Sequence, residues 1–299
     1  MLSPTHLRKL FTGLSEIHDL GAFDEVTLEA NPATFDVAKA QLFRDLGVTR
    51  VSLGIQSFTP HVLKTLGREH SAEEAAAAVG ILREAEVAAV NIDLMFSIPG
   101  LSIDDWRQTL EMAISLKPDH ISAYNLTYEE DTAFFESLKK GELDNDEDRD
   151  ASQFLLAHEL LTAAGFEHYE TSNYARPGHR SSHNRGYWRG EDYLGLGPSA
   201  VSTLQSVRTK NVPDTADYVR MVGSLGNAVV ESETLDAEQL RLERIALMLR
   251  TEEGLPRALV DDAAVDHLIE LGLAEVRGGN VVLTLAGSPL VDPIAGELA

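Results

Sequence analysis

The feature that most constrains the fold is a short apolar run over residues 88–100, which carries two polar residues and is closed by a Pro-Gly pair. A run of this length, bounded by turn residues and preceded by a helical stretch, is typical of a buried parallel strand. Side chains alternate across a strand, so Asn91 and Asp93 share one face. A carboxylate there is costly without a partner, and ligands gather at the carboxyl ends of parallel strands. Asp93 is therefore the first candidate site residue; the alternative is a structural cap for the helix that starts near Ser102.

Strands and helices alternate along the first part of the chain. The helices are predicted over the first twenty residues and over 34–46, 59–66, 71–86, 103–116, 132–139 and 147–164. The strands are predicted over 25–31, 50–58, 88–95, 120–127 and 166–174. This alternation indicates right-handed βαβ units and a parallel sheet.

One face of successive strands is polar. Its residues are Glu29, Ser52, Gly54, Gln56, Asn91 and Asp93. In a closed eight-stranded barrel, branched apolar side chains fill the lumen, so this pattern favours an open or partial barrel around a polar ligand. The inward face of 120–127 stays open, because Ser122 and Tyr124 compete with Asn125 and Thr127.

Composition excludes several classes of function. A net charge of -23 argues against nucleic acid or an anionic membrane surface as partner. The sequence has no stretch of 18 apolar residues, so we expect no transmembrane segment and a cytoplasmic protein. It has no cysteine, which excludes disulfides, thiolate nucleophiles and cysteine-ligated clusters on this chain. We assign no catalytic residue and no metal ligand.

We divide the chain into three parts: 1–175, a loop-rich connecting region over 176–234, and 235–299. Residues 176–202 lack periodicity, and segments of that kind are usually functional or disordered; their aromatic residues argue against disorder. His183 in this stretch is a candidate ligand for haem iron, or else an ordinary surface histidine. The last part reads as helices followed by a hairpin turning at 278–280, as in small winged-helix-like domains.

Six motifs together resemble a known family. They are Leu-Glu-Ala-Asn-Pro (28–32), Ser-Leu-Gly-Ile-Gln-Ser-Phe (52–58), Leu-Gly-Arg (66–68), Asn-Ile-Asp-Leu-Met (91–95), Tyr-Glu-Thr-Ser-Asn-Tyr-Ala-Arg-Pro-Gly (169–178) and His-Asn-Arg-Gly-Tyr-Trp (183–188). In this order they resemble the radical S-adenosylmethionine (SAM) family of oxygen-independent coproporphyrinogen III oxidases, and within it the haem chaperones of the HemW type.

The resemblance implies a radical SAM (β/α)6 barrel that holds SAM against a [4Fe-4S] cluster, followed by the winged-helix-like domain. It also implies SAM contacts at Glu29, Gln56, Arg68, Asp93 and Thr127. The alternative for Arg68 is a surface ion pair with Glu69 or Glu73. Haem binding is expected to depend on His183, with His168 and His179 as the other candidate ligands.

The chain also departs from the family. The family's Cys-x-x-x-Cys-x-x-Cys motif and its Gly-Gly-Gly-Thr-Pro stretch are both missing, so the chain looks like a partial barrel without its first two strands. Either the start of the gene model is misplaced or the protein has lost this chemistry. We expect the former, because Glu29, Gln56, Arg68 and Asp93 persist.

Two functions remain open. One is a haem chaperone that binds haem or porphyrin and delivers it to client proteins. The other is an oxidase that decarboxylates coproporphyrinogen III to protoporphyrinogen IX. Anaerobic turnover of coproporphyrinogen by a chain with the cysteine motif discriminates between them.

Overall fold

The computed structural model describes residues 2–127 and 146–299. They form two compact units: the first extends to Ser181, and the second spans Ser182–Ala299. No helix in either unit, as far as the chain is described, is both long and apolar enough to cross a membrane. The predicted three-part division of the chain stays a prediction.

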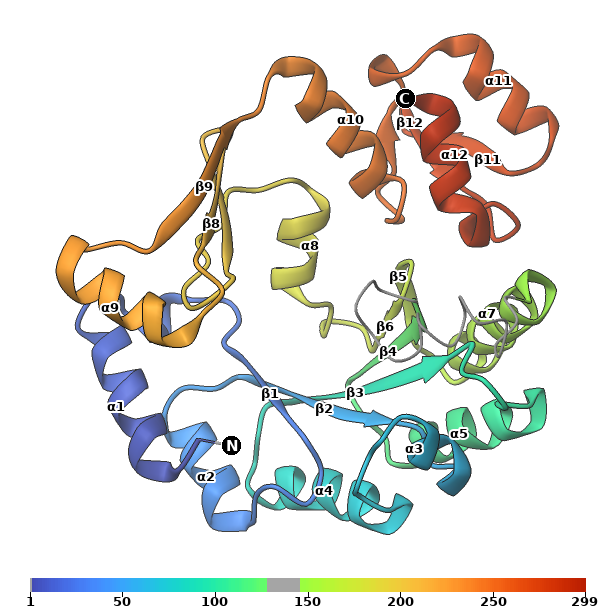
Figure 1. Cartoon of the computed structure of the whole chain (residues 1–299). Coiled ribbons are helices and arrows are strands. Elements are labelled where there is room, and N and C mark those ends of the chain that lie inside the picture. Colours follow the sequence, from blue (N-terminus) through green and yellow to red (C-terminus); the bar gives the residue numbers. More distant parts are fainter. Residues whose placement is uncertain (1, 128–145) are drawn as a thin grey trace. The chain divides into compact units, whose positions relative to one another are not determined.

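The first unit is built on a six-stranded sheet in the order β1-β2-β3-β4-β6-β5 (Figure 1). Its strands are β1 (Thr27–Ala30), β2 (Arg50–Gln56), β3 (Ala89–Phe96), β4 (His120–Asn125), β5 (Glu167–Glu170) and β6 (Asn173–Ala175). The first four are parallel, as the alternating elements predict.

Helices connect these strands. They are α1 (Pro4–Ser15), the 3-10 turn η1 (Leu20–Ala22), α2 (Val37–Asp45), α3 (Pro60–Thr65), α4 (Ala72–Glu84), α5 (Ile103–Ser115) and α7 (Glu147–Ala163). Local signals start two of them: Ser71 and Ser102 each accept a hydrogen bond from the backbone of an acidic residue three positions later. The helix predicted over 132–139 lies outside the described residues.

The apolar faces of the parallel strands form the core with these helices. Leu53, Ile92 and Leu110 are fully buried, as is Trp106, whose indole N–H donates to the backbone oxygen of Gln153 at 2.9 Å. Since apolar residues fill one side of the sheet, the alternation leaves the polar residues of the same strands on the other.

The single strand predicted over 166–174 is wrong. It is a tight hairpin in which β6 runs antiparallel to both β4 and β5. The buried carboxylate of Glu170 explains the reversal, because it accepts hydrogen bonds from Ser172 N at 2.9 Å and from the side-chain amide of Asn173. The sheet is therefore mixed.

The second unit begins with a helix where a loop was predicted. Residues 182–188 form α8 (Ser182–Trp188), so that expectation is wrong for the His-Asn-Arg-Gly-Tyr-Trp motif. A three-stranded antiparallel sheet follows, made of β7 (Val201–Leu204), β8 (Val207–Asn211) and β9 (Val229–Thr234), with α9 (Thr215–Leu225) between the last two.

The remainder of this unit has the expected winged-helix-like order of elements. These are α10 (Ala237–Met248), β10 (Leu255–Pro256), η2 (Arg257–Leu259), α11 (Asp262–Glu270), β11 (Ala274–Arg277), β12 (Asn280–Leu283), η3 (Ser288–Leu290) and α12 (Val291–Leu298). The hairpin turns at Gly278 and Gly279, as predicted, and both have positive φ angles, +60° and +89°, which glycine adopts without strain.

Candidate functional site

Four polar side chains meet on one face of the parallel sheet. The register places Ser52 of β2 beside Asn91 of β3, and Asp93 beside Ser122 of β4. Ser52 Oγ donates to Asp93 Oδ2 at 2.6 Å. Asn91 Nδ2 donates to Ser52 Oγ at 2.6 Å, to Asp93 Oδ1 at 2.7 Å and to Ser122 Oγ at 3.0 Å. Ser122 therefore lies on the same face of the sheet as Asn91 and Asp93, which answers the question of which residues of 120–127 point to this side.

Asp93 does not cap the helix that follows its strand. The helix cap is Ser102, whose side chain accepts from Asp105 N, so the alternative role for Asp93 is wrong. Burial raises the pKa of Asp93, and the charge of Glu29 adds to this effect, while the three hydrogen bonds from Ser52, Ser122 and Asn91 oppose it. The three hydrogen bonds hold the Asp93 side chain in place, but they offset only part of the pKa increase that burial causes.

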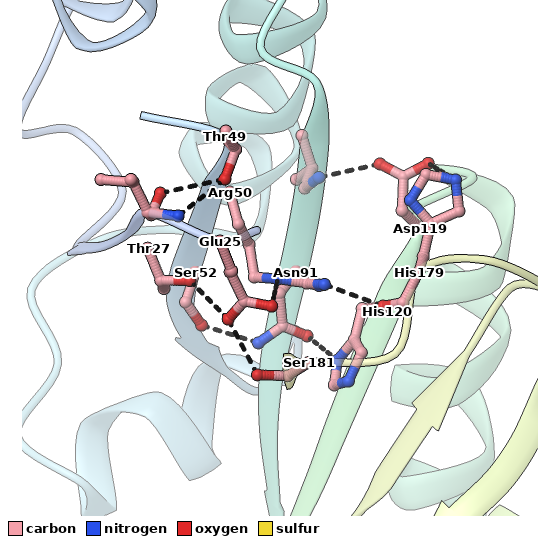
Figure 2. A network of polar contacts seen from close by, with 12 residues as sticks. Glu25, Thr27, Thr49, Arg50, Ser52, Asn91, Asp119, His120, His179 and Ser181 are labelled. Carbon is pink, nitrogen blue, oxygen red and sulfur yellow. Dashed lines mark hydrogen bonds and ion pairs between the residues drawn. The ribbon is translucent and has the colours of Figure 1, made fainter. Parts of the chain in front are cut away.

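Asn91 continues this network toward the amino-terminal ends of the strands (Figure 2). Its oxygen accepts from His120 Nδ1 at 2.7 Å. Burial, together with the charge of Arg50, lowers the pKa of His120 well below its usual value, so the imidazole is neutral. An amide oxygen only accepts, so Nδ1 carries the hydrogen and Nε2 accepts from the Tyr169 hydroxyl at 2.8 Å. Tyr169 in turn accepts from Ser181 N at 3.2 Å.

An ion pair closes the same end of the sheet. Arg50 Nε lies 3.4 Å from Glu25 Oε2, and both side chains are more than 90% buried, at 8% and 9% exposed. Arg50 also donates to the backbone oxygen of His179 at 2.9 Å, and Glu25 accepts from Ser181 Oγ at 2.9 Å. Figure 2 shows these groups converging on the segment that ends the first unit.

Gln56 is strained at the other end of β2. Its φ angle is +69°, which is uncommon for a residue with a side chain, and it follows an irregularity in the pairing of β2 with β3. Its side chain is buried, yet no protein group bonds its oxygen in the described part of the chain. Gly54 leaves room beside it, since an added Cβ would lie 3.3 Å from Gln56 Nε2. Strain and an unpaired buried oxygen are typical of a ligand site.

The remaining predicted residues differ in their placement. Arg68 donates to Asn31 Oδ1 at 3.3 Å, beside Gly54, and makes no ion pair with either nearby glutamate among the described residues. Thr127 is exposed just after β4 and bonds none of the other predicted residues in the described ranges. Glu29 is exposed on β1.

His183 lies in the second unit, at an aromatic cluster. Its ring meets the Tyr187 ring edge to face, with centroids 4.8 Å apart, and Tyr187 meets Tyr193 at 4.7 Å. His183 is exposed, and across residues 2–127 and 146–299 its ring nitrogens have no hydrogen-bond partner. Sequence reasoning missed Glu253, which lies 64 residues beyond Arg189 in the chain and accepts hydrogen bonds from both Arg185 and Arg189.

Comparisons with known proteins match stretches of the chain that include both the parallel sheet and α8. The family model of the radical SAM superfamily matches residues 2–113. The chain is 37% identical over 278 residues to the heme chaperone HemW of Mycobacterium tuberculosis, which covers 92% of this chain and 71% of that protein. The chain belongs to the HemW family of radical SAM proteins. The HemW of Bacillus subtilis is 29% identical over 308 residues, covering 99% of this chain and 81% of its own.

A solved structure shows the same fold. The coproporphyrinogen III oxidase HemN of Escherichia coli, a radical SAM enzyme, superposes with a TM-score of 0.80 at 21% identity. The match covers 99% of this chain and 74% of the oxidase. At that identity the likeness establishes the α/β architecture and carries no activity.

Membership in the radical SAM superfamily implies SAM and a [4Fe-4S] cluster for the family. The residues of this chain suit SAM but lack the usual ligands of the cluster. None of its 299 residues is cysteine, so the chain supplies no thiolate ligand for a cluster. The residues do suit SAM: the unpaired oxygen of Gln56 and the carboxylates of Asp93 and Glu29 are acceptors for an amino group and ribose hydroxyls.

Proposed function

We propose that this HemW family member binds haem on α8 and passes it to acceptor proteins, and that the polar face of its sheet holds SAM. The observation that carries the proposal is the extent of the relationship. A relative named heme chaperone matches 99% of this chain, so the match includes both the sheet and α8.

The geometry at α8 supports haem ligation by His183. Ligation requires an imidazole nitrogen that no other group occupies, and the exposed ring of His183 has both nitrogens without a partner among the described residues. His168 does not, because its Nδ1 lies 3.0 Å from His158 Nδ1 and its Nε2 lies 3.3 Å from the backbone oxygen of Thr171. The rings of Tyr187 and Tyr193 add flat apolar surface on which a porphyrin can pack.

For SAM we assign the contacts to Glu29, Gln56, Arg68 and Asp93, with Thr127 at the margin. SAM supplies a sulfonium centre, which is attracted to carboxylates such as Glu29 and Asp93. Its own carboxylate needs a cation, for which the Arg68 guanidinium is suited. When bound, SAM supplies an adenosyl group; this chain's part is to bind and orient it.

Haem titration tests the first half of the proposal. The Soret band is followed for the wild type and for His183→Ala, His168→Ala and His179→Ala, with His267→Ala as the matched control, since His267 is another exposed histidine of the second unit. Only His183→Ala should shift the band and weaken binding by roughly tenfold, since the apolar contacts remain. If His183→Ala leaves both unchanged, the ligand assignment is wrong.

Transfer tests the second half. Haem-loaded chain is mixed with rising concentrations of apomyoglobin as a generic acceptor, and the rate of haem movement is measured. Direct handover gives a rate that rises with acceptor concentration, whereas a constant rate means simple dissociation and contradicts the delivery role. The natural client and the cytoplasmic location stay predictions.

The oxidase is the second candidate. Its support is the fold shared with HemN, and this likeness concerns the fold and not the activity. Anaerobic conversion of coproporphyrinogen III to protoporphyrinogen IX by a cluster-bearing form of this protein would overturn the chaperone proposal.

A further inference from the structure

Helix α8 is too short and too exposed to hold itself in place. It has seven residues and none of them is buried. Isolated helices of this length are unstable in water, so contacts with other elements must fix it. If α8 presents a haem ligand, these contacts decide how firmly the ligand is held.

The carboxylate of Glu253 supplies three such contacts, all of them charge-assisted hydrogen bonds. Arg189 Nε donates to its Oε2 at 2.9 Å and Arg189 Nη2 to its Oε1 at 2.6 Å, which is the two-pronged geometry of a guanidinium on a carboxylate. Arg185 Nη2 donates to the same Oε1 at 2.9 Å. The two arginines also lower the pKa of Glu253 to about 2.

Glu253 lies in the turn between α10 and β10, and this turn packs closely against β12. Its backbone oxygen accepts from Asn280 Nδ2 of β12 at 2.8 Å. The next residue, Gly254, has a φ angle of +69°, and a Cβ there would lie 2.4 Å from the oxygen of Val281. Leu255 follows, fully buried in the C-terminal core. The carboxylate is thus anchored to the winged-helix-like domain.

The spacing along α8 separates the anchor from the ligand. Arg185 and Arg189 are four residues apart and therefore lie on one side, with Arg189 N bonded to the oxygen of Arg185. His183 and Tyr187 are also four apart, two positions out of step with the arginines. At 3.6 residues per turn, two positions turn the helix by roughly 200°, so the two pairs point in nearly opposite directions.

We propose that Glu253 is a positioning residue for haem: by gripping Arg185 and Arg189 it orients α8 so that His183 and Tyr187 face the porphyrin. This inference rests on the proposed haem site. It gives the C-terminal domain a role in haem binding, because the domain carries the residue on which the orientation of the ligand depends.

Glu253→Gln is the test, and Glu243→Gln is its matched control. Glu243 makes a comparable two-pronged pair with Arg208 in the same unit, at 2.5 and 2.8 Å, and has no hydrogen bond or ion pair with α8 among the described residues. We measure amide hydrogen exchange over residues 185–190 without haem, and haem affinity in the wild-type and His183→Ala backgrounds.

In Glu253→Gln, exchange in this segment should rise roughly three- to tenfold, while Glu243→Gln leaves it unchanged. Haem affinity should fall by a similar factor in the wild-type background and not at all in His183→Ala, since the two residues act through one contact. Equal losses in both backgrounds, or unchanged exchange, would overturn the inference. A wild type that binds no haem would sink the proposed function, and the exchange result alone would then decide whether Glu253 holds α8.

Discussion

The two candidate sites of this protein are held in place by different kinds of contact. On the sheet, Asp93 is fixed by short hydrogen bonds from neutral, buried groups, chiefly Asn91. On α8, the helix bearing His183 is fixed by ion pairs to Glu253 whose side chains are about a third exposed. A buried neutral network resists salt but is costly to break, whereas exposed ion pairs are weak singly and are screened by salt. We therefore expect salt to loosen the contacts that hold α8 and to leave those around Asp93 unchanged.

The largest effect should come from Asn91→Ala. Each of Asp93, Ser52, Ser122 and His120 loses its hydrogen bond to Asn91 and is left with an unpaired buried group, so the loss should be about 4 kcal/mol of unfolding free energy. Urea unfolding in a Trp188→Phe background measures it.

Trp106 then reports on the first unit alone, because it is one of two tryptophans in the chain. Ser122→Ala, which removes one hydrogen bond to Asn91 and one to Asp93, should cost less, about 2 kcal/mol. Equal losses in Ser122→Ala and Asn91→Ala would show that Asn91 does not organise the network.

Acid should weaken the first unit next. Burial lowers the pKa of His168 to about 4, and it also lowers the pKa values of His158 and His120. The unfolded state binds more protons than the folded state between the ordinary value of 6.5 and about 4, so stability falls as the pH drops through this window. The contribution of His168 is on the order of 3 kcal/mol.

His168→Phe keeps a ring to stack on Tyr174 and removes the titration. Its stability should therefore change less between pH 6.5 and 4 than that of the wild type. The raised pKa of Asp93 acts in the opposite sense, above its ordinary value of 3.8. An unchanged pH slope in His168→Phe would mean that this imidazole is not held neutral.

A smaller loss of stability should distinguish two tyrosines of the β5–β6 hairpin, one with a bonded hydroxyl and one without, as far as the chain is described. Tyr169→Phe deletes the hydroxyl that bonds His120 and Ser181, and should cost about 1 kcal/mol in urea unfolding. Tyr174→Phe should cost nothing or stabilise slightly, because its buried hydroxyl has no partner among the described residues. The opposite ranking would contradict the hydrogen-bond chain.

The smallest effect concerns salt. Raising the salt concentration to about 1 M shortens the screening length to roughly 3 Å, so amide exchange in α8 should rise by about two- to fivefold. Exchange in β3 should stay constant, since neutral hydrogen bonds are not screened. A parallel rise in both elements would remove the contrast between the two regions.

These two regions also differ in how far the sequence predicts them. The polar face of β2 and β3 follows from strand alternation, a local pattern that placed Ser52, Asn91 and Asp93 together. The path from His120 to Tyr169 depends on the hairpin β5–β6, whose antiparallel return no local pattern announced. Helix α8 lacks apolar periodicity, and its anchor Glu253 lies 64 residues beyond Arg189, so the motif read as a loop.

The most direct test of the central claim is the electron paramagnetic resonance spectrum of the ferric haem complex. We predict a histidine-ligated spectrum in the wild type and in His267→Ala, replaced in His183→Ala by the spectrum of iron without that ligand. One spectrum shared by all three proteins would show that α8 does not supply the haem ligand and would contradict the account.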